Sequence, residues 1–465
     1  MKNIARIAAA FLIVTALAVP SFAQRGSANF TRFVALGDSY GAGLESGSLN
    51  ERHQVWSWPA VIARQAGAVD FQQPLVSFPG IGPELQIVNI TSFPPVIQPA
   101  AGTGQPINLA LARPYNNLSI PGATVRDLHT LTGAQQPTRT AESFAQFILR
   151  ASAFPQPLTP VQQAVLLQPT FIAMWIGGND YLGAVLAGTP AGLTSVEQFR
   201  TSYTTVLDTL IAGAPNAGIV VGNLPTATNI PVVSTVQPVI INPATRQPLL
   251  VGGNPVFLFA DLGGGNLGQL PAGSRVLLTA AGDIASGYGI PPALATQPPF
   301  NQLPNAGKPL ADRHVITPDE MTAITTRVNE YNTVINQLAS ARNIPVADIR
   351  SLFNRWTSTT TPYFVGPIRL SSSYITGGLF SLDGFHLTDI GYLLFANEYI
   401  RTINEAYDTD IPQASLSQLF ENNGAFFPGT ADDHARVTLT PAAEAQIFSF
   451  ATQPAPKRRF RASTH

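Results

Sequence analysis

The chain has 465 residues, of which 26 are Lys or Arg and 27 are Asp or Glu, so its formal net charge is −1. Charged residues make up 11% and hydrophobic residues 45%, and mean hydropathy is +0.14. This composition is typical of a globular protein with a large core and excludes a disordered chain. It also provides no basic surface for a phosphate backbone, so nucleic acid is not an expected partner. The absence of cysteine excludes disulfides, thiol nucleophiles and cysteine-ligated metals.

The first 23 residues have the pattern of a secretory signal peptide. Lys2 and Arg6 precede an apolar run over residues 8–19, and small residues before Gln24 favour cleavage at that point. The run is too short for a comfortable membrane span, and polar residues, Pro or Gly interrupt every later candidate. We therefore expect a mature protein that begins near Gln24, has no transmembrane segment, and is secreted or periplasmic in a bacterium.

Four short apolar runs, each followed by a loop signal, are typical of strands in a parallel sheet. They are Phe33–Leu36, Phe171–Ile176, Ile219–Val221 and Ile344–Ala347. Stretches with helical periodicity alternate with them, notably residues 196–210 and 321–338, and a capping box of Thr317 and Glu320 marks the start of the second. The alternation predicts an α/β fold whose ligand binds beyond the carboxyl ends of the strands.

Two stretches depart from this pattern. Between residues 229 and 313 the periodicity fails and Pro and Gly dominate, which predicts a large insertion that forms a small subdomain or a cap over the crevice. Surface decoration is the alternative. The predicted organisation is a signal at 1–23, one main domain at 24–407, and a C-terminal extension at 408–465 that ends in the basic tail Lys457–Arg459.

The first candidate for chemistry is Gly37-Asp38-Ser39-Tyr40-Gly41, which directly follows the first strand. A serine in a tight turn flanked by glycines exposes its hydroxyl at the sheet edge, so Ser39 is the candidate nucleophile. Because Gly-Asp-Ser is also common turn chemistry, an ordinary turn is the alternative. We expect Asp38 to brace the turn through hydrogen bonds and not to titrate in catalysis.

The second candidate is Asp383-Gly384-Phe385-His386, which precedes a helical stretch late in the chain. Asp383 can reach the imidazole of His386 and fix its tautomer, so that the other ring nitrogen takes the proton from Ser39. A capped helix start with a surface histidine is the alternative. The other histidines are His53, His129, His314, His434 and His465. Of these, only His434 directly follows carboxylates, Asp432 and Asp433, and we interpret that polar stretch as a solvated loop.

Two further blocks provide hydrogen-bond donors. Asn179 follows the paired glycines Gly177 and Gly178 after an apolar strand, where its amide can point toward a ligand. Gly122, in the block Asn117–Thr124, could offer an unobstructed backbone N–H. For the Asn179 block an ordinary turn at the end of the strand is the alternative.

Together the four blocks resemble the SGNH, or GDSL, hydrolase family over most of the chain, from about Phe33 to Tyr407. The resemblance implies a flavodoxin-like three-layer α/β/α sandwich and ester hydrolysis without a metal or cofactor. Tyr40 departs from the family pattern, where leucine is common, and so do the insertion and the extension. None of these departures removes a catalytic group, but variable loops build the substrate pocket in such folds.

The resemblance also assigns residue roles. It implies that Ser39 is the nucleophile and that Asp383 and His386 complete the triad. It further implies an oxyanion hole made by the backbone N–H groups of Ser39 and Gly122 and the side chain of Asn179. Each such donor is typically worth about 10²–10³ in rate.

The sequence therefore predicts a secreted serine esterase or lipase that forms an acyl-enzyme. The alternatives are a conventional α/β-hydrolase, a catalytically silent surface-binding protein, and an O-acetyl esterase acting on polysaccharides. The apolar run Val256–Phe259 in the insertion favours lipid-like acyl esters. We expect core packing for Trp56 and Trp58, with lining of an acyl or aglycone pocket as the alternative for both and for Tyr181. The natural ester and the oligomeric state stay open.

Overall fold

A four-stranded parallel sheet lies at the centre of the computed structural model, which describes residues 24–90, 95–242 and 245–421. Its strands lie in the order β14 (Val346–Ala347), β7 (Gly218–Gly222), β6 (Phe171–Trp175) and β3 (Phe33–Gly37). The sheet confirms the predicted α/β fold. The expected signal peptide, His434, His465 and the tail Lys457–Arg459 lie outside the described residues.

A further segment extends the sheet beyond β3. Asn117 forms a parallel bridge with Ala35, whose N–H donates to the Asn116 carbonyl (2.8 Å) and whose carbonyl accepts from Leu118 (2.9 Å). The spatial order is therefore the Asn117 segment, β3, β6, β7 and β14, which is the flavodoxin-like order. The Asn117 segment thus lies on one side of β3, and the later strands β6, β7 and β14 lie on the other side. The switch point between β3 and β6 is where an open sheet of this kind binds its ligand.

The strand predictions hold in position, and β14 is shorter than expected. The prediction spanned Ile344–Ala347, whereas β14 includes only its last two residues. Pro345 interrupts the pairing because it has no N–H, although its carbonyl still accepts from Val221 (3.1 Å). In contrast, β3 and β6 are buried along their whole length, as expected for strands covered on both faces.

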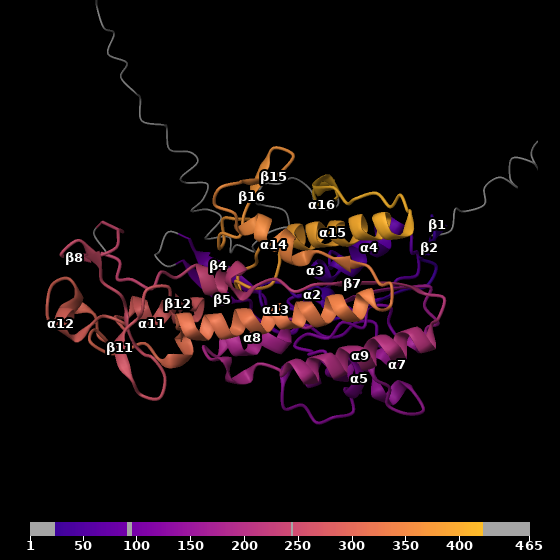
Figure 1. Cartoon of the computed structure of the whole chain (residues 1–465), viewed down its shortest axis with the longest axis horizontal. Coiled ribbons are helices and arrows are strands. Elements are labelled where there is room, and N and C mark those ends of the chain that lie inside the picture. The colour runs from indigo at the N-terminus through magenta and orange to yellow at the C-terminus, as the bar shows by residue number, and fades with distance from the viewer. Residues whose placement is uncertain (1–23, 91–94, 243–244, 422–465) are drawn as a thin grey trace, which may run out of the picture.

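Helices cover both faces of the sheet, giving three layers (Figure 1). One face carries α4 (Trp58–Ala66), α14 (Ile349–Thr357) and α15 (Asp389–Tyr407), and the other carries α5 (Asp127–Thr130), α7 (Pro160–Leu166), α8 (Asn179–Leu186), α9 (Val196–Gly213) and α13 (Pro318–Ser340). The predicted capping box is confirmed: the Glu320 N–H donates to Thr317 Oγ1, and the Glu320 carboxylate accepts from the Thr317 N–H. No helix in the described part of the chain combines the length and apolarity needed to span a membrane.

Smaller elements surround the sandwich. Short helices are α2 (Ser39–Ala42), α3 (Glu51–Gln54), α6 (Thr140–Leu149), α10 (Pro231–Ser234), α11 (Ala281–Ala285), α12 (Pro292–Ala295) and α16 (Leu416–Glu421). Antiparallel pairs are β1 (Gln24–Arg25) with β2 (Ala28–Asn29), β4 (Leu85–Asn89) with β5 (Val96–Pro99), β8 (Leu250–Val251) with β9 (Asn254–Pro255), β10 (Phe259–Asp261) with β11 (Leu267–Gln269), β12 (Arg275–Val276) with β13 (Val315–Ile316), and β15 (Tyr363–Val365) with β16 (Ile368–Leu370).

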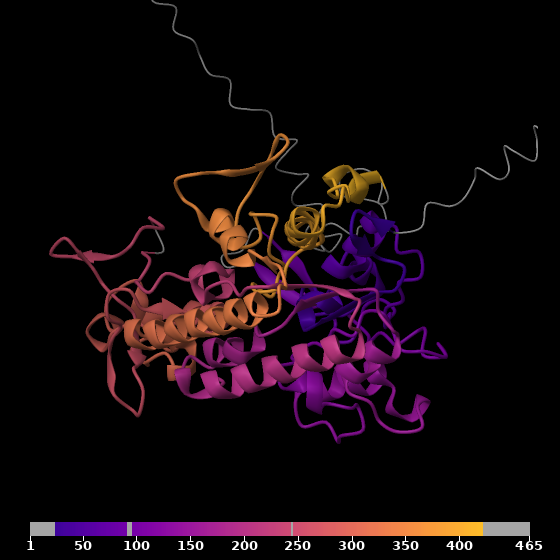
Figure 2. The same ribbon diagram turned by 45° about the vertical axis from the view of Figure 1, so that its right-hand side comes forward.

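The chain between α10 and β13 has a small core of its own. Its buried side chains include Ile240, Leu258, Leu270, Ile290 and Leu310, which form a cluster separate from the main core. In both views the elements from β8 to α12 lie at one end of the molecule, beside the start of α13 (Figures 1 and 2). Val256, Phe257 and Leu258, from the run that favoured lipid-like acyl esters, pack in this second core.

The turn after β3 depends on glycine because the chain passes very close to its neighbour. A Cβ at Gly41 would lie 2.8 Å from the Ser119 Cβ and closer still to the Ser119 hydroxyl. Ser119 is itself fully buried beside the Asn117 segment, so it has little room to move. Gly41 therefore allows the turn that carries Ser39 to pack against the adjoining edge of the sheet.

We predict that Gly41→Ala lowers the free energy of unfolding by about 1–3 kcal/mol through overpacking. Gly183 is the matched control, because it lies inside α8 with no atom within 4 Å of an added Cβ. Gly183→Ala should be neutral or raise stability by about 0.5–1 kcal/mol through helix propensity. Urea unfolding of both variants measures the difference. Equal stability of the two would contradict the close approach at Gly41.

Candidate active site

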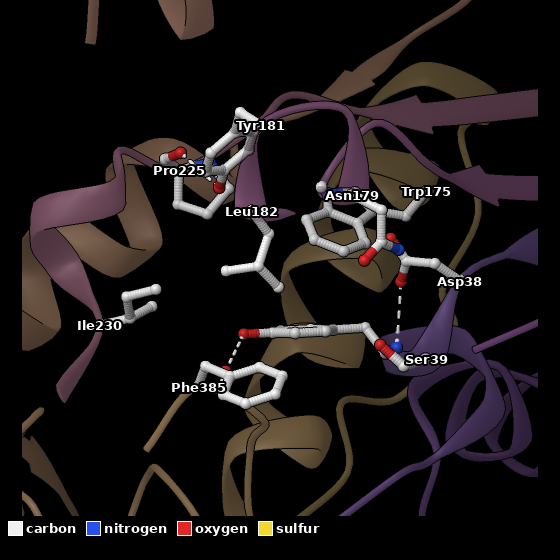
Figure 3. Close-up of a pocket in the computed structure, with 11 residues that line it drawn as sticks. Asp38, Ser39, Trp175, Asn179, Tyr181, Leu182, Pro225, Ile230 and Phe385 are labelled. Carbon is white, nitrogen blue, oxygen red and sulfur yellow. Dashed lines mark hydrogen bonds between the residues drawn. The ribbon is translucent and has the colours of Figure 1, made fainter. Parts of the chain in front are cut away.

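Ser39 is the first residue of α2, directly after β3. Asp38 caps this short helix, because its Oδ1 accepts a hydrogen bond from the Tyr40 N–H (3.0 Å). The Leu44 N–H donates to the Ser39 carbonyl (3.0 Å) and closes the turn. The Ser39 side chain lines a pocket at the carboxyl end of the strand (Figure 3). Within the described part of the chain, the Ser39 hydroxyl makes no hydrogen bond.

Asp383 and His386 form a direct pair. The His386 Nδ1 lies 2.8 Å from Asp383 Oδ2, and the two side chains are 5% and 8% exposed. Burial alone would raise the pKa of Asp383, but the charge of His386 and hydrogen bonds from His386 and from the Phe385 N–H outweigh it and lower the pKa to about 2. An ionised carboxylate only accepts, so Nδ1 carries the ring proton. When the ring is neutral, Nε2 can accept a proton, and this buried atom has no hydrogen-bond partner among the described residues.

Contacts from the serine side hold this pair. The Gly47 N–H donates to Asp383 Oδ2 (2.8 Å), and the Ser46 N–H donates to Ser381 Oγ (2.9 Å). The pair lies in a loop that ends before α15, whose N-cap is Thr388. The loop that follows Ser39 is therefore fastened directly to the loop that carries the histidine.

Tyr40 connects the two candidates further. Its hydroxyl donates to the Phe385 carbonyl, and its ring centroid lies 5.7 Å from that of His386. No hydrogen bond joins Ser39 to His386 among the described residues. The structure thus places Ser39 and the Asp383–His386 pair on adjoining loops with Tyr40 between them. Sequence reasoning treated Tyr40 only as a departure from the family pattern and missed this contact.

The expected oxyanion donors also lie together. Asn179 begins α8, directly after β6 and its glycines, and its Nδ2 donates to the Ala123 carbonyl (2.9 Å). That bond places Asn179 beside Gly122, whose φ of 81° is in the left-handed region that favours glycine. Within the described residues, the backbone N–H groups of Ser39 and Gly122 donate to no other group. The second amide hydrogen of Asn179 is also unused, because an amide nitrogen carries two.

The pocket beside Ser39 is mostly apolar. Figure 3 shows side chains from the segments that follow β3, β6 and β7 and from the histidine loop, and the lining includes Trp175, Tyr181, Leu182, Pro225, Ile230 and Phe385. The Tyr181 hydroxyl donates to the Pro225 carbonyl (3.0 Å), which fixes the pocket wall. Trp56 and Trp58 are buried in the main core and do not line the pocket, so core packing is confirmed for both.

Among the described residues of the predicted insertion, only those at its start reach this pocket. Ile230 lines it, and the Val232 N–H donates to the Gly384 carbonyl (2.8 Å) in the histidine loop. The apolar run 256–259 contributes no lining residue. This run therefore gives no support to a lipid-like acyl ester as substrate.

Two histidines outside the pair also have carboxylate neighbours. His53 Nδ1 lies 3.2 Å from both Glu45 and Asp389, and His314 Nδ1 lies 3.2 Å from Asp283. The comparison of the histidines in the sequence missed these contacts, because it considered only carboxylates adjacent to each histidine. His53 and Asp389 are 336 positions apart, and no local pattern signals their contact.

Two buried carboxyls at or near the pocket have raised pKa values. Burial raises the pKa of Asp38 from 3.8 to about 8, against the hydrogen bond from the Tyr40 N–H, and nearby Asp180 raises it further. Burial likewise raises the pKa of Asp180 to about 7. Both groups stay protonated in the folded protein well above the pH at which an unfolded chain ionises them.

We predict that Asp38→Asn reduces the pH dependence of stability. Because folded Asp38 keeps its proton, its contribution to stability is fully present below about pH 4 and is lost as pH rises through the folded pKa of about 8. Asparagine cannot ionise, and its amide oxygen can still accept from Tyr40. Denaturant unfolding at pH 5 and pH 8.5 measures how much the free energy of unfolding falls between the two pH values. This decrease should be smaller in the variant than in wild type. An unchanged loss would show that Asp38 is ionised in the folded state.

Comparisons with known proteins identify the family. The model of the GDSL-like Lipase/Acylhydrolase family matches residues 33–399. No curated protein matches the chain at a significant level. Similar solved structures include an acetylxylan esterase from Geobacillus stearothermophilus, with 14% identity over 80% of this chain and 93% of that one and a TM-score of 0.32. Another is an extracellular lipase from Streptomyces rimosus, with 15% identity over 80% of this chain and 98% of the lipase chain and a TM-score of 0.33.

The family match spans the four sequence blocks, from the strand before Ser39 to the helix after His386. The chain belongs to the GDSL-like lipase/acylhydrolase family and is a hydrolase of ester bonds.

Proposed function

We propose that this protein is a secreted serine esterase that cleaves carboxylic esters through an acyl-enzyme on Ser39. The observation that carries the proposal is the buried Asp383–His386 pair, in which Nδ1 faces the carboxylate and Nε2 has no partner within the described residues. A base held in this way, on a loop fastened to the loop of a pocket serine, is the arrangement that activates a hydroxyl for acyl transfer.

In the first half-reaction the Ser39 Oγ attacks the ester carbonyl carbon, and its proton passes to His386 Nε2. Asp383 keeps the imidazole oriented and stabilises the imidazolium. The tetrahedral intermediate collapses when the proton on Nε2 passes to the leaving alkoxide, which departs as the alcohol. Water then attacks the acyl-enzyme with His386 again as base, and the carboxylic acid leaves.

Three hydrogen-bond donors would stabilise the negative charge that develops on the carbonyl oxygen. We assign these to the backbone N–H groups of Ser39 and Gly122 and the free amide hydrogen of Asn179. This assignment is supported by the hydrogen bond from the Asn179 side chain to the Ala123 carbonyl, which holds that side chain beside Gly122. Such donors do not need to reorganise during the reaction, which is why they are effective in a buried site.

For the substrate we propose an ester with an apolar acyl group. The aromatic and aliphatic lining around Ser39, including Trp175, Leu182 and Ile230, supports it. An O-acetyl group on a polysaccharide is the second candidate, since an acetyl group needs no deep acyl pocket. The basic and apolar segment at 1–23 supports export by a cleaved signal. We retain 24–407 as the hydrolase domain, with 229–313 as an insertion and 408–465 as an extension.

Ser39→Ala and His386→Ala should each abolish ester turnover while circular dichroism and thermal unfolding stay those of a folded protein. Asn179→Ala should lower kcat by roughly 10²–10³ with a smaller change in KM, because its donor acts on the transition state. His434→Ala is the control and should keep full activity. A near-normal rate in Ser39→Ala would contradict the proposed mechanism. An inactive His434→Ala would show that the wrong histidine was assigned.

Hydrolysis of a chromogenic ester series from acetyl to palmitoyl, with acetylated glycans alongside, tests the substrate class. We expect serine-dependent activity on acyl chains longer than acetyl, because the pocket lining is apolar. Activity confined to acetyl groups would identify a carbohydrate O-acetyl esterase. Absent activity on every ester, with folded protein, would favour a catalytically silent binding protein.

A further inference from the structure

Behind the active-site loops, three side chains from distant parts of the sequence converge in the interior. Glu45 follows the Ser39 turn, His53 lies in α3, and Asp389 is the first residue of α15. All three are buried, with at most 1% of each side chain exposed. One donor atom from each lies within 4.8 Å of the other two.

This cluster has fewer hydrogen-bond donors than carboxyl oxygens. His53 Nδ1 lies 3.2 Å from Glu45 Oε2 and 3.2 Å from both Asp389 oxygens. Its single proton can serve Asp389, whereas both oxygens of Glu45 are buried without a hydrogen-bond partner among the described residues. An unpaired buried carboxylate is costly. Either a proton shared with Asp389 or a bound cation must therefore satisfy Glu45.

The spacing of these atoms matches the coordination sphere of a metal ion. With metal–ligand bonds of about 2.1–2.2 Å, a separation of 3.2 Å between two ligand atoms corresponds to an angle of about 95° at the metal. This is close to octahedral geometry, with Asp389 able to bind through both oxygens. One imidazole with carboxylates and no thiolate suits a divalent first-row ion such as Mn²⁺ or Zn²⁺.

The other side of the imidazole also fits a metal ligand. His53 Nε2 faces Glu84 Oε2 at 3.6 Å, and the Asn50 side chain donates to the same oxygen (3.3 Å). Histidines that bind metals commonly direct their second nitrogen toward a carboxylate, which fixes the tautomer that leaves the first nitrogen free to ligate. Glu84 would orient His53 in this way.

We propose that Glu45, His53 and Asp389 bind one divalent transition-metal ion that joins the loop after Ser39 to the helix after His386. The ion is structural and does not touch the reacting ester. With neutral His53, the ion balances the charges of Glu45 and Asp389. The alternative is a proton shared between these two carboxyls, with no metal bound.

Metal analysis of the purified full-length protein tests this directly. After dialysis with Mn²⁺ or Zn²⁺ and removal of free ion, mass spectrometry of the elements should find about one ion per chain, and excess EDTA should lower Tm by several degrees. Glu45→Gln and Asp389→Asn should lose the ion. Asp283→Asn is the matched control, because it removes the carboxylate that lies 3.2 Å from His314, and it should retain the ion.

The shared proton gives the opposite results. Glutamine resembles a protonated glutamate, so Glu45→Gln would then keep the wild-type Tm, and wild type would bind no ion and show no response to EDTA. Any of these results overturns the proposal. If the variants fail to fold, the ion content and EDTA response of wild type still decide it, and neither depends on esterase activity.

Discussion

The hydrogen bonding of the Asp383 carboxylate is the constraint on which the rest of the site depends. It accepts from the Gly47 N–H on the serine side and from the Phe385 and His386 N–H groups on its own loop, in addition to facing Nδ1 of His386. A buried carboxylate with so many donors remains ionised, and an ionised Asp383 fixes both the tautomer and the position of the imidazole. One buried charge therefore holds together two loops that are far apart in sequence.

The sheet places these loops where that charge can join them. The order of strands reverses between β3 and β6, so the residues that follow these two strands, Ser39 and Asn179, lie at one crevice. The Asn117 segment on the other side of β3 brings Gly122 to the same place through the bond between Asn179 and Ala123. The close packing of Gly41 on Ser119 shows how tightly the turn is fitted to this edge.

The sequence predicted the parts of this arrangement that have local signals. The strand before Ser39, the capping box at Thr317 and the pairing of Asp383 with His386 each rest on residues within a few positions of one another. Features that depend on distant residues could not be predicted in this way. The contact of Tyr40 with the histidine loop and the cluster around His53 join residues more than 300 positions apart. The packing of Val256, Phe257 and Leu258 in a second core likewise depends on the fold as a whole.

The central claim is that Ser39 is the nucleophile activated by His386. Reaction with a fluorophosphonate, followed by mass spectrometry of proteolytic peptides, tests it without knowledge of the natural ester. The account predicts a single phosphonyl adduct on Ser39, no adduct in Ser39→Ala, and much slower labelling in His386→Ala. An adduct on another residue, or equal labelling of wild type and Ser39→Ala, would contradict it.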